Sequence, residues 1–225
     1  MRKEVHKVNG LFITFEGPDG SGKTSVIQQI VPRLERALGQ SVVATREPGG
    51  SRIAETIRQV ILNPEHTEMD ARTEALLYAA SRRQHITETI LPALEGGEIV
   101  LCDRFVDSSL VYQGIGRGIG VEEVAEMNRF ATEGLKPDVT LYLDVESEVG
   151  LERIKQNQGN RQYDRLDQET LAFHRQVREG YLTLLEKYPE RITRIDANQS
   201  LADVVEDTWR QLEQFIAQHY ASKEG

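Results

Sequence analysis

Short apolar runs, rich in β-branched residues, alternate along this chain with longer segments of helical periodicity. Runs that are apolar at nearly every position are typical of strands buried on both faces of a parallel sheet. They predict strands over residues 11–16, 41–45, 98–103, 139–145 and 192–196. The segments between them predict helices over residues 23–38, 53–62, 70–94, 122–132, 146–156, 168–187 and 201–219. This alternation predicts a three-layer α/β fold, a five-stranded parallel sheet with helices on both faces.

Two segments interrupt the alternation. Residues 113–120 are rich in glycine but lack the preceding strand and the glycine spacing of a dinucleotide-binding turn. Residues 157–167 are polar and lie between two predicted helices, which indicates a surface loop. No internal repeat, low-complexity stretch or Pro/Ser-rich linker divides the chain. We therefore expect residues 1–225 to form one domain.

Composition narrows the possible functions. Lys and Arg total 27 against 36 for Asp and Glu, a formal charge of −9, which argues against a nucleic-acid-binding surface. No run approaches the roughly 18 apolar residues of a membrane span, and the charged first residues do not predict a signal peptide. The single cysteine, Cys102, excludes a disulfide framework. These features predict a cytoplasmic protein with neither a nucleic-acid nor a membrane partner.

One motif indicates a nucleoside triphosphate site. Residues 17–24 fit the pattern G-x-x-x-x-G-K-[ST] at every position, after a predicted strand and at the start of a predicted helix. Backbone N–H groups of such a loop hold phosphate oxygens at the positive end of the helix. A glycine-rich turn that merely joins strand to helix is the weaker alternative, because it does not require this pattern. The predicted phosphate-binding residues are Gly17, Pro18, Asp19, Gly20, Ser21, Gly22, Lys23 and Thr24.

A divalent metal is expected beside this loop. Lys23 should reach the β- and γ-phosphates, and the Thr24 hydroxyl should bind Mg²⁺. Asp103 ends a run of four apolar residues, where a carboxylate can help to hold the same ion directly or through water or phosphate. Cys102 is interpreted as a small buried strand residue rather than a nucleophile. The histidines show no metal-ligand spacing, so no transition-metal site is predicted.

Phosphate-binding loops serve switches, motors and small-molecule kinases, so further residues must distinguish these classes. The guanine-reading Asn-Lys-x-Asp of a GTPase is not present in the sequence. A kinase needs a second site with cations directed at an acceptor, and the carboxyl ends of parallel strands converge on one crevice. Isolated arginines follow the second and third predicted strands and occur in the long helix.

The segments around these arginines closely resemble the thymidylate kinase family of P-loop nucleoside monophosphate kinases. They are Phe15-Glu16-Gly17, Arg46-Glu47-Pro48-Gly49-Gly50, Tyr78 with Arg82, Asp103-Arg104 and Tyr112-Gln113-Gly114. The resemblance runs from the first predicted strand to residues 196–199, nearly the whole chain. It implies a P-loop kinase fold with a short lid, and transfer of phosphate from Mg-ATP to dTMP, giving dTDP for dTTP synthesis. The rivals are a monophosphate kinase for another base and a nucleotide-dependent switch that binds a partner.

The resemblance also assigns an acceptor site. Arg46 and Arg104 match positions that hold the 5′-phosphate, a task suited to the planar guanidinium. Tyr78 would stack on the base beside Arg82, one helical turn away. Each assignment has a structural alternative without a function. Arg46 and Arg104 could form surface salt bridges, and Tyr78 and Arg82 could be a core aromatic and a solvated arginine. The segment around Pro48 could be a plain β-turn. The implied dTMP-binding residues are Asp19, Arg46, Pro48, Tyr78, Arg82, Arg104, Ser108, Ser109, Tyr112 and Gln113.

A lid over about residues 153–167 is implied in the same way. It carries Arg153, Lys155, Arg161 and Arg165, an excess of positive charge suited to a polyphosphate. Gly20 stands where one branch of the family has an arginine, so a lid arginine should supply the catalytic cation. The implied catalytic residues are Lys23, Arg104, Arg153 and Arg161. The family resemblance also implies a homodimer, to which residues 70–94 would contribute an apolar face.

Overall fold

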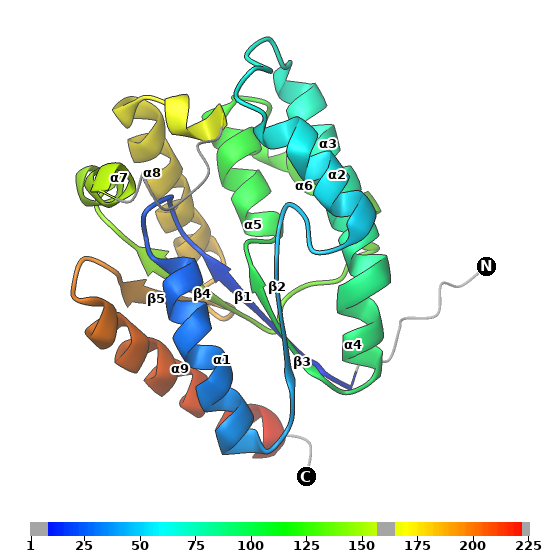
Figure 1. Ribbon diagram of the computed structural model, residues 1–225, viewed down its shortest axis with the longest axis vertical. Helices are drawn as coiled ribbons and strands as arrows, with labels where there is room; N and C mark the ends of the chain where they lie inside the picture. Colours follow the sequence, from blue (N-terminus) through cyan, green and yellow to red (C-terminus); the bar gives the residue numbers. More distant parts are fainter. Residues whose placement is uncertain (1–8, 157–164, 222–225) are drawn as a thin grey trace.

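The computed structural model describes residues 9–156 and 165–221. Five parallel strands form one sheet in the order β2-β3-β1-β4-β5. They are β1 (Leu11–Glu16), β2 (Val42–Arg46), β3 (Ile99–Asp103), β4 (Val139–Asp144) and β5 (Ile192–Asp196). Helices cover both faces of this sheet (Figure 1). The predicted α/β architecture is therefore confirmed, with strand ends displaced by one residue at most.

Alternate residues of the central strand β1 face opposite layers. Leu11, Ile13 and Phe15 pack with α1 (Lys23–Leu38) and α9 (Leu201–Ala221) on one face. Phe12 points to the other face, where it packs with Ile86 and its neighbours. Because both faces are covered, the strands are apolar at nearly every position.

The remaining helices lie between and around the strands. They are α2 (Arg52–Leu62), α3 (Ala71–His85), α4 (Leu91–Glu95), α5 (Val106–Ser109), α6 (Val121–Thr132), α7 (Ser147–Gln156) and α8 (Leu171–Lys187). Two π-helical segments, η1 (Ile86–Ile90) and η2 (Leu110–Gly116), and the 3₁₀ turn η3 (Arg165–Gln168) complete the described chain. Within residues 9–156 and 165–221, no helix combines the length and the apolar character that crossing a membrane requires.

The helix predicted over residues 70–94 forms, but not as one regular α-helix. It runs as α3, η1 and α4 in succession, so its middle turn is π-helical. Pro92 explains the change, since a proline has no N–H to donate and its ring crowds the carbonyl one turn earlier. Asp70 caps the start of α3 by accepting from the N–H groups of Arg72 and Thr73.

The glycine-rich segment over residues 113–120 interrupts the helices only in its second half, residues 117–120. Residues 106–116 are helical through α5 and η2. A Cβ added at Gly116 would lie 2.7 Å from the Phe173 ring, and one at Gly114 would lie 3.2 Å from Val121 Cα. These glycines let α6 and α8 approach η2 closely, which is a packing role that composition alone does not separate from a turn.

Candidate active site

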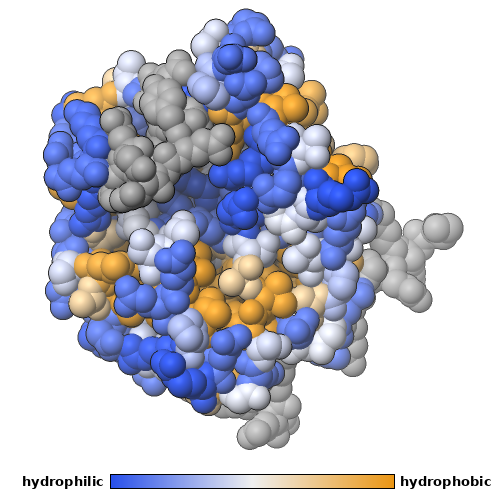
Figure 2. Space-filling model, viewed as in Figure 1, coloured by the Kyte–Doolittle hydropathy of each residue, from blue (hydrophilic) through white to orange (hydrophobic). Residues whose placement is uncertain are grey.

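The carboxyl ends of three neighbouring strands lie at one level of the sheet. Arg46 of β2 is in register with Asp103 of β3, which is in register with Phe15 of β1. The phosphate-binding loop follows β1 directly. A cavity of about 620 Å³ opens at this edge, and hydrophilic side chains surround the hollow seen in Figure 2. Sequence positions that are far apart thus meet at one crevice, as expected for a parallel sheet.

Lys23 crosses the phosphate-binding loop. Its Nζ donates to the carbonyl oxygens of Gly17 and Pro18, each at 3.0 Å, and to Ser21 Oγ at 3.3 Å. The side chain is buried but lines the cavity. Burial and the nearby Arg104 charge lower the pKa of Lys23 to about 8. An anion entering the loop would favour the protonated lysine, so the ammonium is suited to phosphate binding.

The residues predicted to hold Mg²⁺ lie side by side. Thr24 Oγ1 donates to Asp103 Oδ2 at 2.8 Å, and both residues line the cavity. A hydroxyl and a carboxylate next to a phosphate-binding loop form a hard-oxygen donor set, which fits Mg²⁺ with substrate phosphates completing the coordination.

Arg104 has the most constrained backbone at the site. Its φ of 71° lies in the left-handed region, and its N–H donates to the Phe15 carbonyl oxygen at 2.9 Å. This conformation turns the chain sharply after β3. The guanidinium then donates to Asp19 Oδ1 at 2.7 Å and to the Ser108 and Tyr112 hydroxyls at 3.1 and 3.2 Å. A non-glycine residue held in this way is consistent with a functional constraint.

Asp19 and Tyr112 complete the pairing of Arg104. Tyr112 Oη donates to Asp19 Oδ2 at 2.9 Å. Burial raises the pKa of Asp19. The charges of Arg104 and Lys23 and the Tyr112 hydrogen bond outweigh this effect and hold the pKa well below its usual range. Burial works against the Arg104 cation, yet Tyr112 and Asp19 raise the pKa of Arg104 above its usual value. Both groups are therefore ionised, and an acceptor phosphate would meet a fixed cation.

The structure brings together most residues predicted for the two substrates. Those lining the cavity are Asp19, Gly20, Ser21, Gly22, Lys23, Thr24, Arg46, Pro48, Tyr78, Asp103, Arg104 and Arg153. Arg46 also pairs with Glu55 at 2.9 Å. Arg58 of α2, which no sequence pattern indicated, is a further cation in the lining. Its Nη1 donates to the Pro48 carbonyl oxygen at 2.8 Å.

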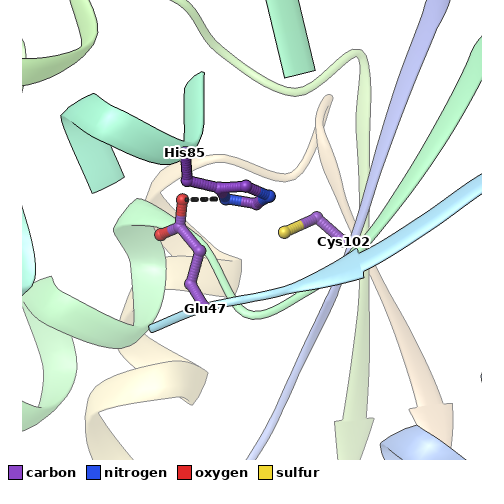
Figure 3. Close-up of side chains that lie close together, drawn as sticks. All are labelled: Glu47, His85 and Cys102. Carbon is purple, nitrogen blue, oxygen red and sulfur yellow. Dashed lines mark hydrogen bonds and ion pairs between the residues drawn. The ribbon is translucent and has the colours of Figure 1, made fainter. Parts of the chain in front are cut away.

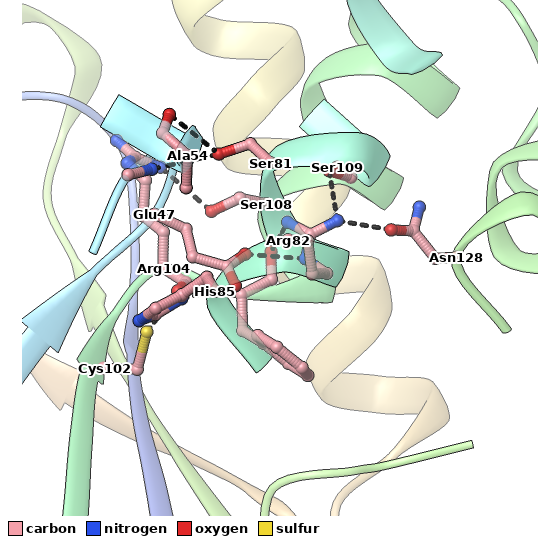
Figure 4. A network of polar contacts seen from close by, with 12 residues as sticks. Glu47, Ala54, Ser81, Arg82, His85, Cys102, Arg104, Ser108, Ser109 and Asn128 are labelled. Carbon is pink, nitrogen blue, oxygen red and sulfur yellow. Dashed lines mark hydrogen bonds and ion pairs between the residues drawn. The ribbon is translucent and has the colours of Figure 1, made fainter. Parts of the chain in front are cut away.

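Five predicted acceptor residues lie instead behind the cavity wall. Arg82 is only 1% exposed, and it is the largest fully buried side chain in the described structure. Its guanidinium donates to Glu47 at 2.6 Å, to Ser109 Oγ at 3.1 Å, to the Phe105 carbonyl oxygen at 2.8 Å and to Asn128 (Figure 4). The alternative of a solvated arginine is wrong. The other four, Ser108, Ser109, Tyr112 and Gln113, are also buried and hydrogen-bonded inside the protein.

Glu47 connects Arg82 to a second buried group. Its Oε1 contacts His85 Nδ1 at 3.0 Å, and His85 Nε2 contacts Thr45 Oγ1 at 2.7 Å. Ligand atoms of Glu47, His85 and Cys102 lie within 4.8 Å of one another (Figure 3). The Arg82 cation on the same carboxylate opposes a metal ion there. We interpret the bonds among Glu47, His85 and Thr45 as a structural contact between α3 and the end of β2.

Cys102 is expected to resist modification in the folded protein. Burial, and then the charges of Glu47 and Asp103, raise the pKa of this thiol well above its usual value. The reactive thiolate is therefore scarce at neutral pH. A disulfide reagent such as DTNB should titrate Cys102 only after denaturant is added, which absorbance measures directly. Rapid modification of the native protein, with activity retained, would contradict this placement.

Glu16 is, after Arg58, a second ionisable residue at this site to which no role was assigned from sequence. It is fully buried and accepts from Phe105 N at 2.8 Å, Ser108 Oγ at 2.5 Å and Tyr181 Oη at 2.8 Å. The available signal was a carboxylate at the end of a buried strand, the same signal that identified Asp103. Burial, and then the Asp107 charge, raise the pKa of Glu16 to about 7.

This shift predicts a pH dependence of stability. A carboxyl that ionises less readily in the folded state contributes stability below its unfolded pKa of 4.5 and loses it as pH rises through about 7. Glu16→Gln should remove this part of the pH dependence. Urea unfolding from about pH 5 to about pH 8 would measure it in both proteins. Parallel curves for the two would contradict the assignment.

The lid prediction needs correction at both ends. Arg153 and Lys155 belong to α7, and Arg153 donates to the carbonyl oxygens of Ala197 at 2.8 Å and Gln199 at 3.3 Å. Arg165 is buried in η3, where it pairs with Glu74 and donates to the Ile61 carbonyl oxygen at 3.1 Å. It anchors the chain and does not face a polyphosphate. Arg161 lies outside the described residues.

Gly20 cannot be replaced by a larger residue in this arrangement. Its φ is +80°, and an added Cβ would overlap the Gly150 carbonyl group of α7. The loop and α7 are therefore in direct backbone contact. This contact gives a physical reason for the absence of an arginine at position 20.

A family model described as thymidylate kinase matches residues 15–208. The chain belongs to the thymidylate kinase family. The thymidylate kinase of Latilactobacillus sakei is 64% identical over 196 residues, 87% of this chain and 91% of the relative. That of Ligilactobacillus salivarius is 58% identical over 209 residues, 93% of this chain and all of the relative. The thymidylate kinase structure from Ehrlichia chaffeensis matches with a TM-score of 0.72 at 31% identity, covering 90% of this chain and 98% of the other. The resemblance that the sequence motifs indicated is confirmed.

Proposed function

We propose that this protein transfers the γ-phosphate of ATP to dTMP, forming dTDP and ADP in the synthesis of dTTP. The observation that carries the proposal is one cavity lined by both a phosphate-binding loop and a second set of cations, Arg46, Arg58 and Arg104. A switch needs the first set only. The two sets would hold a donor and an acceptor phosphate within reach of each other, as in-line transfer requires.

The chemistry needs charge neutralisation more than proton transfer. The acceptor is a phosphate monoester with a second pKa of about 6, so it is mostly dianionic at neutral pH and needs no general base. Lys23 would hold the donor phosphates, and Arg104 would hold the acceptor phosphate. Thr24 and Asp103 would hold Mg²⁺ directly or through water or phosphate. The ion, when bound, offsets charge on the β- and γ-phosphates. Arg153, or Arg161 in the undescribed segment, would add a further cation.

We assign the remaining predicted residues to the acceptor nucleoside. Tyr78 in the lining offers a ring for stacking on the base. Asp19, also in the lining, and Tyr112, which donates to it, would lie beside the sugar. Arg82, Ser108, Ser109 and Gln113 form the layer behind them. Contact of these four with dTMP would require their present hydrogen bonds to be shared with the nucleotide.

The proposal includes a homodimer and a cytoplasmic location. Apolar side chains are exposed on the adjacent helices α2, α3 and α6: Ile53 at 42%, Val60 at 40%, Leu76 at 60% and Phe130 at 89%. A second copy packed against these helices would cover them. Use of ATP and a buried reduced Cys102 are consistent with the cytoplasm. Sedimentation equilibrium would test the dimer.

The test of the function is ADP release from Mg-ATP with each nucleoside monophosphate in turn. We expect strong stimulation by dTMP, weaker by dUMP and little by AMP, GMP or CMP. Stimulation by another monophosphate alone would keep the kinase and remove the thymine assignment. No stimulation by any of them would overturn the kinase and favour a nucleotide-dependent switch.

A further inference from the structure

Helix α3 and the helical segment of residues 106–116 face each other through matched positions. Glu74, Tyr78 and Arg82 follow at intervals of one helical turn on α3, and so share a face. Arg82 donates to Ser109 Oγ at 3.1 Å, and Gln113 Nε2 donates to Glu74 Oε1 at 2.8 Å. Tyr78, between these two contacts, lines the cavity. Gln113 and Ser109 therefore flank the level at which an acceptor base would stack.

Glu74 is a buried anion held by two arginines. It is 1% exposed, and Arg165 pairs with its Oε2. Arg117 Nε donates to Oε1 at 3.3 Å, and its Nη2 lies 3.3 Å from Oε2. Burial raises the pKa of Glu74, but the Gln113 hydrogen bond and the charges of Arg117 and Arg165 lower it below its usual value. The carboxylate is therefore ionised at neutral pH.

An ionised carboxylate can only accept hydrogen bonds. The Gln113 atom beside Glu74 must therefore be the amino group, because the amide oxygen would meet another acceptor. The reversed amide, with the oxygen toward Glu74, would place two acceptors together in a buried site and leave both without a donor.

We propose that Glu74 is a specificity-determining positioning residue, which fixes the Gln113 amide so that its carbonyl oxygen remains for the acceptor base. This inference rests on the proposed function, in which Gln113 lies on the base side of the site. Thymine and uracil carry an N–H at N3 that can donate to such an oxygen. Cytosine has an unprotonated N3, which would meet this oxygen acceptor to acceptor. Glu74 thus selects for the thymine and uracil edge and against cytosine.

The test is the substitution Glu74→Gln, which keeps size and removes charge. The new amide would turn its oxygen to Arg165, which pairs with Oε2, and its amino group to Gln113, while Arg117 would keep its pairing with Glu169. Gln113 would then present its own oxygen to residue 74 and its amino group to the base. We expect the ratio of kcat/KM for dTMP over dCMP to fall by about tenfold or more, while the ratio for dTMP over dUMP stays unchanged.

Two further measurements make the outcome decisive. Glu74→Asp retains the charge, so it should retain the dTMP over dCMP ratio even where kcat falls. This variant also serves if Glu74→Gln does not fold, which thermal unfolding would reveal. An equal loss of kcat/KM for dTMP, dUMP and dCMP in Glu74→Gln, or a collapsed ratio in Glu74→Asp, would overturn the inference. Failure of the wild-type protein to use dTMP would instead overturn the proposed function.

Discussion

Replacing Lys23 with methionine is expected to lower turnover by about 10³-fold or more. The ammonium donates to Gly17, Pro18 and Ser21 within the phosphate-binding loop, and no other lysine lines the cavity in the described part of the chain. Methionine fills similar space but carries no charge for the γ-phosphate. The initial rate of ADP formation with saturating ATP and dTMP measures the loss.

The same substitution at Lys136 provides the control. Lys136 is exposed and lies outside this cavity, so Lys136→Met should retain wild-type activity. Thermal unfolding of both variants would show whether they fold. A folded Lys23→Met protein with activity within about tenfold of wild type would remove the phosphate-binding loop from the reaction.

Arg104→Lys should lower kcat/KM for dTMP by about 10³-fold, while the dissociation constant for ATP changes less than about threefold. Lysine retains the charge but not the fork that contacts Asp19, Ser108 and Tyr112 together. It would place one point charge where two phosphate oxygens must be held. Steady-state kinetics with dTMP, and equilibrium binding of ATP, separate the two effects.

An exposed arginine gives the matched comparison for that substitution. Arg175 of α8 pairs with Glu148 at the surface, and Arg175→Lys should leave both constants unchanged. An equal loss of ATP affinity and dTMP use in Arg104→Lys would move Arg104 out of the acceptor site. The Glu16 and Cys102 predictions do not depend on substrate, so they test the burial of this region separately.

The sequence predicted those features that a short segment determines. The strands, the phosphate-binding loop and Asp103 depend on neighbouring residues, and the structure has them at the predicted places. Pairings over long separations were not predictable in this way. Arg165 and Glu74 are 91 positions apart, so nothing near Arg165 indicated that its charge is already neutralised. Arg82 could be placed on α3, but its partners come from other elements.

Glycine was the least informative residue in sequence. Gly17 and Gly22 adopt the positive φ angles of the phosphate-binding loop, whereas Gly114 and Gly116 allow close packing of neighbouring helices. Only the position of the neighbouring helix distinguishes these uses. The cavity residue Arg58 was missed for a related reason, because a single arginine on a helix has no pattern that separates it from a solvated one.

The contact between Gly20 and Gly150 links two positions that are 130 residues apart in the printed sequence. A Cβ at Gly150 would in turn lie 2.8 Å from the Asp19 carbonyl oxygen, so neither residue can gain a side chain while α7 stays in place. Evolution could introduce an arginine into this loop only after α7 had moved away. A steric barrier thus separates the two routes for supplying a catalytic cation. A descendant of this chain would be expected to keep both glycines for as long as α7 packs against the loop.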